Sequence, residues 1–165
     1  MKQDRTGKLI AIAREIAKGT PDFQKVSGPG AGDRSTHRFM QALRKKAEEA
    51  FSEDFSEKKI CGDNHFAVDF YLSSEATVIE VALGLPNPNT EFEKDILKAL
   101  MAKEAGNDVR RLVFISRAGA AKKCEQPGRL AVRAWAKDKH ALLIEVHDLP
   151  GKPRQRTRKK KVVTK

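Results

Sequence analysis

Two acidic residues stand inside apolar segments of the chain, where charged side chains are uncommon. Asp69 interrupts the run Phe-Ala-Val-Asp-Phe-Tyr-Leu, and Glu80 interrupts Val-Ile-Glu-Val-Ala-Leu. Removing an unpaired carboxylate from water is costly, so such residues usually have a partner or a function. Mg²⁺ prefers oxygen ligands from one or two carboxylates, and it can activate water and neutralise charge on a phosphodiester. We therefore predict that Asp69 and Glu80 hold a divalent cation and act in catalysis.

The same two acids also have structural explanations, which the sequence leaves open. Both carboxylates could face solvent on a sheet that is covered on one side only. Alternatively, each could pair with one of three arginines, Arg110, Arg111 and Arg133. The site interpretation requires that the two acids meet over one cleft.

A third acid, Glu93, lies in a helix expected from Glu91 to about Ala105. With Phe92 placed at zero and an advance of about 100° per residue, Ile96 falls near 40° and Glu93 near 100°. This places Glu93 on the apolar, sheet-facing side of the helix.

The acid at position 93 also has a structural explanation. Together with Thr90 it forms a Thr-x-x-Glu capping box, which would account for the residue without chemistry. On the same helical projection Lys94 falls near 200° and Lys98 near 240°, so both lysines are expected to point away from the sheet.

The elements that would position these acids follow from the period of the apolar residues. Apolar residues alternate with a period of two in the middle of the chain, which predicts a three-strand antiparallel meander. The later segments alternate strand, helix, strand, helix, strand, which indicates parallel crossovers. The predicted strands are 57–61, 66–73, 77–84, 112–116 and 141–146, and the predicted helices are 8–18, from Asp33 or Ser35 to about 52, 91–105 and 130–136.

We therefore predict a mixed α/β (α+β) fold with a helical N-terminal region and a central mixed sheet of about five strands flanked by helices. Phe66, Val68, Phe70 and Leu72 are expected to share one face of the second strand. Strands 112–116 and 141–146 are continuously apolar, which is typical of buried positions.

Positive charge is concentrated at the end of the chain. Residues 150–165 contain eight basic residues and no acid, and subtracting eight from the net charge of +11 leaves +3 for the remainder. We predict a folded domain over residues 1–149 and a disordered basic tail over 150–165 that contacts nucleic-acid phosphates in a salt-sensitive way. The predicted nucleic-acid-binding residues are Arg154, Arg156, Arg158, Lys159, Lys160 and Lys161.

Several classes of protein are disfavoured by composition. Cys61 and Cys124 are the only cysteines and have no ligand-like spacing, so we expect reduced thiols and a cytoplasmic location. The first apolar stretch, Leu9 to Ile16, is interrupted by two charged residues, which favours an amphipathic helix over a signal peptide. No apolar run approaches the roughly 20 residues of a transmembrane helix, so no membrane partner is expected.

The acids and the order of elements together resemble the PD-(D/E)xK nuclease superfamily, which has the restriction-endonuclease-like fold. The resemblance covers roughly residues 35–149. Asp69 takes the place of the motif Asp on the second strand and Glu80 that of the (D/E)xK acid on the third. The sequence departs from the motif at Ala82, where the family has lysine, and at Val68, where proline is common. The family can move a catalytic group to the following helix, so the resemblance implies Glu93 as a third candidate catalytic residue.

The resemblance implies a Mg²⁺-dependent nuclease that acts on DNA. The alanine at position 82 leaves an alternative open, in which the chain is a catalytically impaired nuclease-fold module that binds nucleic acid or a protein partner. A homodimer formed through an edge strand also stays open.

Overall fold

The computed structural model describes residues 4–20, 31–87 and 90–153. Within these ranges the helices are α1 (Arg5–Lys18), α2 (Ala31–Phe51), α3 (Glu91–Glu104), α4 (Ala120–Cys124) and α5 (Pro127–His140), with a 3-10 turn, η2 (Ser73–Glu75). The strands are β1 (Ser56–Lys58), β2 (Val68–Leu72), β3 (Thr77–Val81), β4 (Arg111–Ser116) and β5 (Leu143–Asp148).

The five strands form one mixed sheet in the order β1-β2-β3-β4-β5. The pairs β1–β2 and β2–β3 are antiparallel, whereas β3–β4 and β4–β5 are parallel. Parallel neighbours require a crossover, and α3 supplies the first, while α4 and α5 supply the second. The predicted fold class is therefore confirmed, including the meander, the parallel crossovers and the helical N-terminal region.

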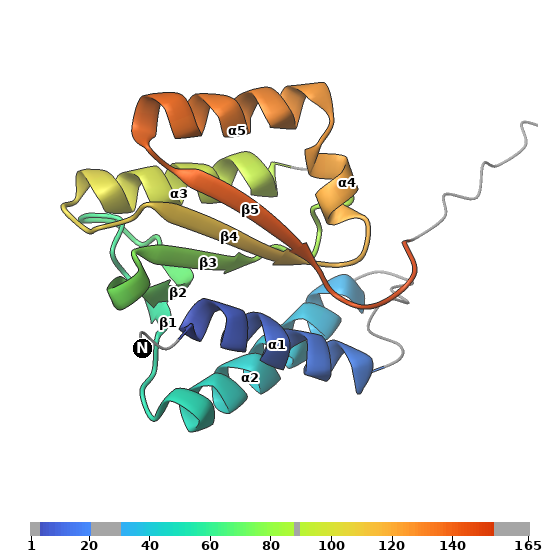
Figure 1. Cartoon of the computed structure of the whole chain (residues 1–165). Coiled ribbons are helices and arrows are strands. Elements are labelled where there is room, and N and C mark those ends of the chain that lie inside the picture. Colours follow the sequence, from blue (N-terminus) through green and yellow to red (C-terminus); the bar gives the residue numbers. More distant parts are fainter. Residues whose placement is uncertain (1–3, 21–30, 88–89, 154–165) are drawn as a thin grey trace, which may run out of the picture.

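The sheet is the middle of three layers (Figure 1). Helices α1 and α2 cover one face, and α3 and α5 cover the other. Side chains alternate across β3 and β4 as the pleat requires. Ile79 and Val113 pack in the core on the α1/α2 side, and Val78 and Leu112 pack in the core on the α3/α5 side.

The two predicted apolar strands differ in burial. Residues 112–116 of β4 are all buried, as predicted for a strand covered on both faces. The strand predicted at 141–146 instead runs Leu143–Asp148, because Ala141 ends α5 in the left-handed conformation with φ 47°. β5 is also the last strand of the sheet and is covered less completely. Leu143 is 46% exposed, so the prediction of a fully buried strand is wrong.

β2 begins at Val68, two residues later than predicted. The backbone N–H of Phe66 donates to Asn64 Oδ1 at 2.8 Å, which holds this segment in a turn. Phe66 is consequently exposed, and its predicted place on the buried face of the strand is wrong.

Helix boundaries depart from the predicted ones in three places. α1 begins at Arg5, three residues before the predicted start. α2 begins at Ala31, before the predicted start at Asp33 or Ser35. The Ser35 hydroxyl accepts a hydrogen bond from Arg117 Nη2 at 3.0 Å. α5 begins at Pro127, a residue well suited to a first helical turn, and is longer than the predicted segment 130–136. The short helix α4 was not predicted.

Three further expectations concern the whole chain. Cys61 and Cys124 are buried free thiols, as predicted. Among the described helices, none has both the length and the apolar character needed to cross a membrane. The six basic residues predicted to bind nucleic acid, Arg154 to Lys161, lie outside the described residues. The division into a domain and a tail therefore stays a prediction.

Candidate active site

Asp69 and Glu80 lie across from each other on neighbouring antiparallel strands. The register pairs Phe70 of β2 with Ile79 of β3, so the next position along both strands brings Asp69 opposite Glu80. Residues directly opposite on one face have Cβ atoms about 5 Å apart. Glu80 points to the α3 side of the sheet, as do its strand neighbours Val78 and Ala82. The two acids therefore share one face of the sheet, and a cation site between them stays a prediction.

Asp69 lies one residue beyond the last paired residues of β2 and β3, at the edge of the candidate site. Its Oδ2 accepts a hydrogen bond from the backbone N–H of Val81 at 2.8 Å, beyond the last paired residues of the two strands. This contact orients the carboxylate beside Glu80. Asp69 is partly exposed, whereas Glu80 is 2% exposed. Solvent therefore reaches the pair of acids from the Asp69 end.

Lys98 of α3 reaches both Glu80 and a further acid, Asp95. Its Nζ lies 2.8 Å from Glu80 Oε1 and 3.0 Å from Asp95 Oδ1. All three side chains are nearly buried, with Lys98 the most exposed at 11%. The prediction that Lys98 points away from the sheet is wrong. Lys94, by contrast, is 56% exposed, as predicted, and its Nζ lies 4.0 Å from Asp95.

The contacts of Lys98 are close but poorly aligned. Both distances are those of ion pairs, yet neither Glu80 Oε1 nor Asp95 Oδ1 has a hydrogen-bond donor in suitable geometry among the described residues. Buried polar atoms are nearly always hydrogen-bonded, and the exceptions often mark sites of function or of a bound ion. Electrostatic attraction to the ammonium is therefore the principal interaction that satisfies these two oxygens.

The site carries more negative than positive charge. Burial raises the pKa of Glu80 well above its ordinary value, and the nearby carboxylates Asp69 and Asp95 raise it further, against the opposing effect of Lys98. Burial acts to lower the pKa of Lys98, but Glu80 and Asp95 outweigh it, so the pKa of Lys98 is raised and the ammonium keeps its proton. Burial likewise raises the pKa of Asp95. The lysine thus neutralises only part of the acidic charge around it.

A fourth acid, Glu91, extends the cluster along α3. Glu91, Asp95 and Lys98 are spaced i, i+4 and i+7, which places them on one stripe of the helix. Burial raises the pKa of Glu91, and the charges of Asp95 and Asp69 add to the effect. We call Asp69, Glu80, Glu91, Asp95 and Lys98 the acidic cluster. Three of its five members were missed, although their helical spacing was visible in the sequence.

Glu93 does not join the acidic cluster. It lies on the exposed side of α3, so the prediction that it faces the sheet is wrong. The buried positions of α3 include Ala99 and Ala102 as well as Phe92 and Ile96. The two alanines shift the centre of the buried face away from Glu93 and toward Asp95 and Lys98.

The predicted capping box at the start of α3 is also absent. The side chain of Thr90, the residue before the helix, makes no capping hydrogen bond. Neither explanation proposed for Glu93 from the sequence therefore applies to its position in the structure.

Ala82 occupies the position where the family motif has lysine, and its surroundings explain the small residue. Its side chain is 1% exposed and packs in the α3-side core. Its carbonyl accepts a hydrogen bond from Ser116 Oγ at 2.6 Å, and its N–H donates to the Ile115 carbonyl at 3.0 Å. Ala82 is thus part of the buried core, and Lys98 of α3 reaches Glu80 on the same face of the sheet.

The arginines considered as partners of the two acids are engaged elsewhere. Arg110 pairs with Asp108 at 2.8 Å, and Arg111 pairs with Glu145 at 2.8 Å. Arg133 Nη2 donates to the Ile144 carbonyl at 3.1 Å. The arginine-pairing explanation for Asp69 and Glu80 is therefore wrong.

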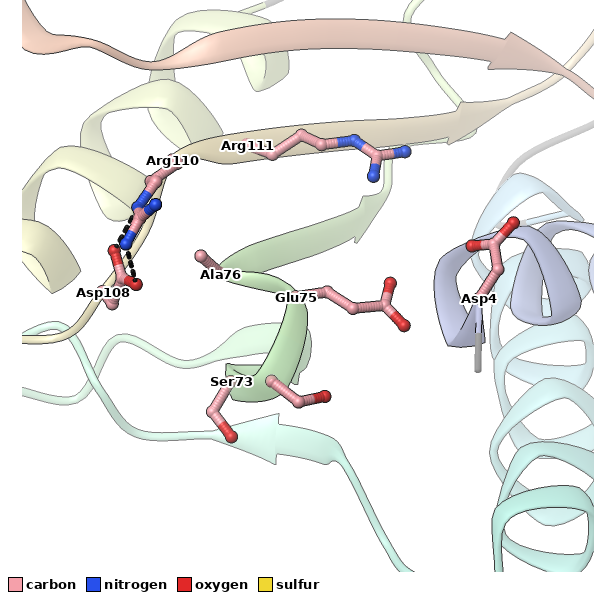
Figure 2. Close-up of a pocket in the computed structure, with 8 residues that line it drawn as sticks. Asp4, Ser73, Glu75, Ala76, Asp108, Arg110 and Arg111 are labelled. Atoms are coloured by element: carbon pink, nitrogen blue, oxygen red, sulfur yellow. Dashed lines mark hydrogen bonds and ion pairs between the residues drawn. The ribbon is translucent and has the colours of Figure 1, made fainter. Parts of the chain in front are cut away.

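A cavity of about 420 Å³ lies at the other end of the sheet, where β3 and β4 begin. It is lined by Asp4, Ser73, Ser74, Glu75, Ala76, Asp108, Arg110 and Arg111 (Figure 2). The Glu75 carboxylate accepts hydrogen bonds from the backbone N–H groups of Arg5 and Thr6, at 2.6 and 3.1 Å, and so caps α1. This cavity contains none of the acidic cluster, and its charged groups serve structural contacts.

The residue types in the acidic cluster suit a hard divalent cation. Glu80 Oε1 and Asp95 Oδ1 are buried oxygens without an aligned donor, and carboxylate oxygens are the ligands that Mg²⁺ prefers. In the arrangement that the structure describes, however, no group of three or more Asp, Glu, His or Cys residues is positioned to hold a metal ion. Glu80 is in contact with the Lys98 ammonium instead.

Comparisons of the chain with protein-family models, with curated proteins and with solved structures returned no match. Arguments about function therefore depend on the geometry and chemistry of the acidic cluster.

Proposed function

We propose that this chain is a divalent-metal-dependent nuclease of the PD-(D/E)xK kind, in which Lys98 of α3 takes the part of the lysine that is absent at Ala82. The observation that carries the proposal is the placement of a buried lysine 2.8 Å from the Glu80 carboxylate, on the face of the sheet where Asp69 also lies. An acid pair can hold a metal ion that assists phosphodiester hydrolysis. An adjacent ammonium can stabilise the negative charge that develops on the phosphate.

Each residue of the proposed site has a distinct role. Asp69 and Glu80 would hold Mg²⁺. When bound, Mg²⁺ supplies Lewis-acid chemistry that lowers the pKa of water and neutralises phosphate charge. The Val81 N–H orients Asp69 toward that site. The Lys98 ammonium, which keeps its proton, stabilises the negative charge that builds on the phosphate as water adds and the ester oxygen leaves.

DNA is the proposed substrate, with the basic residues 150–165 contacting its phosphates. Such contacts are independent of sequence and weaken as salt rises. The buried free thiols Cys61 and Cys124 support a reducing compartment, and we place the activity in the cytoplasm.

A plasmid-cleavage assay tests this proposal. The purified full chain is incubated with supercoiled plasmid and with single-stranded DNA in Mg²⁺, in Mn²⁺ and in EDTA. We expect conversion of the plasmid to nicked or linear forms that requires the divalent ion. Asp69→Asn, Glu80→Gln and Lys98→Met should each reduce the rate by at least about a hundredfold, the range that loss of one preorganised charged group typically causes.

Lys94→Met is the matched control, because it removes the same positive charge from the same helix at an exposed position. The control should cleave at the rate of the unmodified chain. Wild-type cleavage by Asp69→Asn or by Lys98→Met would show that the site is assigned to the wrong residues. Circular dichroism on each variant separates lost chemistry from lost structure.

A second function is favoured by the burial of the ion pairs. Glu80, Asp95 and Lys98 could be a structural triad in a nuclease fold that binds nucleic acid without cutting it. This alternative predicts that the chain retards DNA in a salt-dependent way and cleaves it with no divalent ion tested. Metal-stimulated cleavage that Asp69→Asn abolishes would reject the alternative.

A further inference from the structure

The position of Lys98 conflicts with a cation at Glu80. The Nζ atom lies 2.8 Å from Glu80 Oε1, one of the oxygens that would bind the metal. A divalent cation at the same carboxylate would stand within a few ångströms of a second positive charge. Like charges at such a distance repel strongly in a partly buried site, where water screens them poorly. The ammonium and the metal therefore compete for Glu80.

The contacts of Lys98 allow it to move. Its single ammonium contacts one oxygen of each carboxylate, so neither contact constrains its direction as a bidentate contact would. Lysine also has a flexible four-carbon stem that carries a compact charge. A shift of Nζ off Glu80 gives up one ion pair and can keep the other, to Asp95.

Asp95 offers the ammonium a second partner on the same helix. Its Oδ1 lies 3.0 Å from Nζ at the i, i+3 spacing, and its side chain is 5% exposed. Because Asp95 and Lys98 belong to one rigid helix, their contact can persist when Nζ leaves the strand acid. Without Asp95 the displaced ammonium would be buried and unpaired, which is costly.

Building on the proposed function, we propose that Lys98 is an internal counter-ion that gives up Glu80 to an incoming divalent cation, and that Asp95 is the positioning residue that retains the ammonium beside the site. Lys98 then weakens metal binding while it supplies the charge that the reaction uses. The exchange frees the Glu80 carboxylate to bind the cation beside Asp69.

The test measures Mn²⁺ binding, by calorimetry on the full chain without DNA. Lys98→Met and Lys98→Gln remove the charge, and Lys98→Arg keeps it. We expect both neutral variants to bind Mn²⁺ about tenfold more tightly or better, since they remove a like charge from the site. Lys98→Arg and the control Lys94→Met should bind as the unmodified chain does. The glutamine variant can donate hydrogen bonds to both acids, so it covers the case in which the methionine variant does not fold.

Asp95→Asn identifies the positioning role by a double-mutant cycle. In the unmodified chain this substitution should weaken Mn²⁺ binding, because the displaced ammonium loses its second partner. In the Lys98→Gln background the same substitution should weaken binding several-fold less. An equal effect in both backgrounds means that Asp95 acts only through its own charge, and it would overturn the positioning role.

Two further variants distinguish a failure of this inference from a failure of the proposed function. Asp69→Asn and Glu80→Gln should lose Mn²⁺ binding if the metal site is correctly assigned. If they lose binding while Lys98→Gln binds no more tightly than the unmodified chain, the counter-ion inference alone is wrong. If Asp69→Asn and Glu80→Gln bind Mn²⁺ as the unmodified chain does, or if no form of the chain binds Mn²⁺, the proposed metal site is wrong. The counter-ion inference, which rests on that site, is then wrong as well.

Discussion

Substituting Lys98 by methionine should destabilise the fold far more than substituting Lys94 on the same helix. Lys98 Nζ is held between Glu80 and Asp95, whose side chains are 2% and 5% exposed. Removing one partner of a buried pair typically costs about 3–5 kcal/mol, because the other charge stays buried and uncompensated. Glu80 already has a raised pKa and can take up a proton, which limits the cost. We therefore expect a loss of roughly 2–4 kcal/mol.

Urea unfolding at pH 7, followed by circular dichroism, measures this loss directly. For a chain of 165 residues it corresponds to a melting temperature lower by about 5–12 °C. Lys94→Met should change the free energy of unfolding by less than about 0.5 kcal/mol, since its side chain is largely exposed.

A second substitution tests the cause of the loss. Glu80→Gln in the Lys98→Met background removes the stranded carboxylate, so the double variant should be more stable than Lys98→Met alone. Equal stability of Lys98→Met and Lys94→Met would refute the reasoning, because it would mean that Lys98 does not neutralise a buried acid.

Three other perturbations follow from the described contacts. Glu75→Gln should lower stability by about 1 kcal/mol in urea unfolding, because a neutral amide caps the positive end of α1 less well than a carboxylate; an unchanged midpoint would contradict the assigned cap. Burial acts to raise the pKa of Glu145, but hydrogen bonds from Arg111 and His147 outweigh it and lower that pKa below 4.5. The stabilisation by Glu145 should therefore be present above pH 4.5 and be lost as the pH falls through the lowered pKa. The chain and its Glu145→Gln variant should then differ in urea midpoint at pH 7, and the difference should shrink steadily as the pH is lowered below 4.5. Deleting residues 151–165 should weaken DNA retention in mobility-shift assays and reduce the slope of log affinity against log salt by up to about 0.9 for each cation removed, and an unaltered slope would exclude the tail from the interface.

The sequence carried enough information to predict the sheet and its two acids. Apolar residues with a period of two identified β2 and β3, and a continuous apolar run identified β4. In each case the burial of the strand could be inferred from the residues of that strand alone. Asp69 and Glu80 were visible because a charge inside an apolar strand is exceptional. Their placement opposite each other follows from the register of one hairpin, a short-range property.

The lysine of the candidate site was missed for a different reason. The buried face of α3 was inferred from its large apolar residues, whereas the helix also packs through Ala99 and Ala102. Leu97 is 53% exposed, so size and hydrophobicity alone mark this face poorly. The orientation of a helix around its axis depends on close contact with the sheet, a long-range property that one segment of sequence does not contain. For this reason Glu93 was predicted to face the sheet and Lys98 was predicted to point away from it, and both predictions are wrong.

The central claim is that Asp69, Glu80 and Lys98 form one site that acts on phosphodiesters with a divalent cation. The most direct measurement is the initial rate of supercoiled-plasmid cleavage in Mn²⁺ by the unmodified chain, by Lys98→Met and by Lys94→Met. The account predicts metal-dependent cleavage that is lost with Lys98→Met and kept with Lys94→Met. Equal rates for all three proteins, or no cleavage by the folded, unmodified chain, would contradict it.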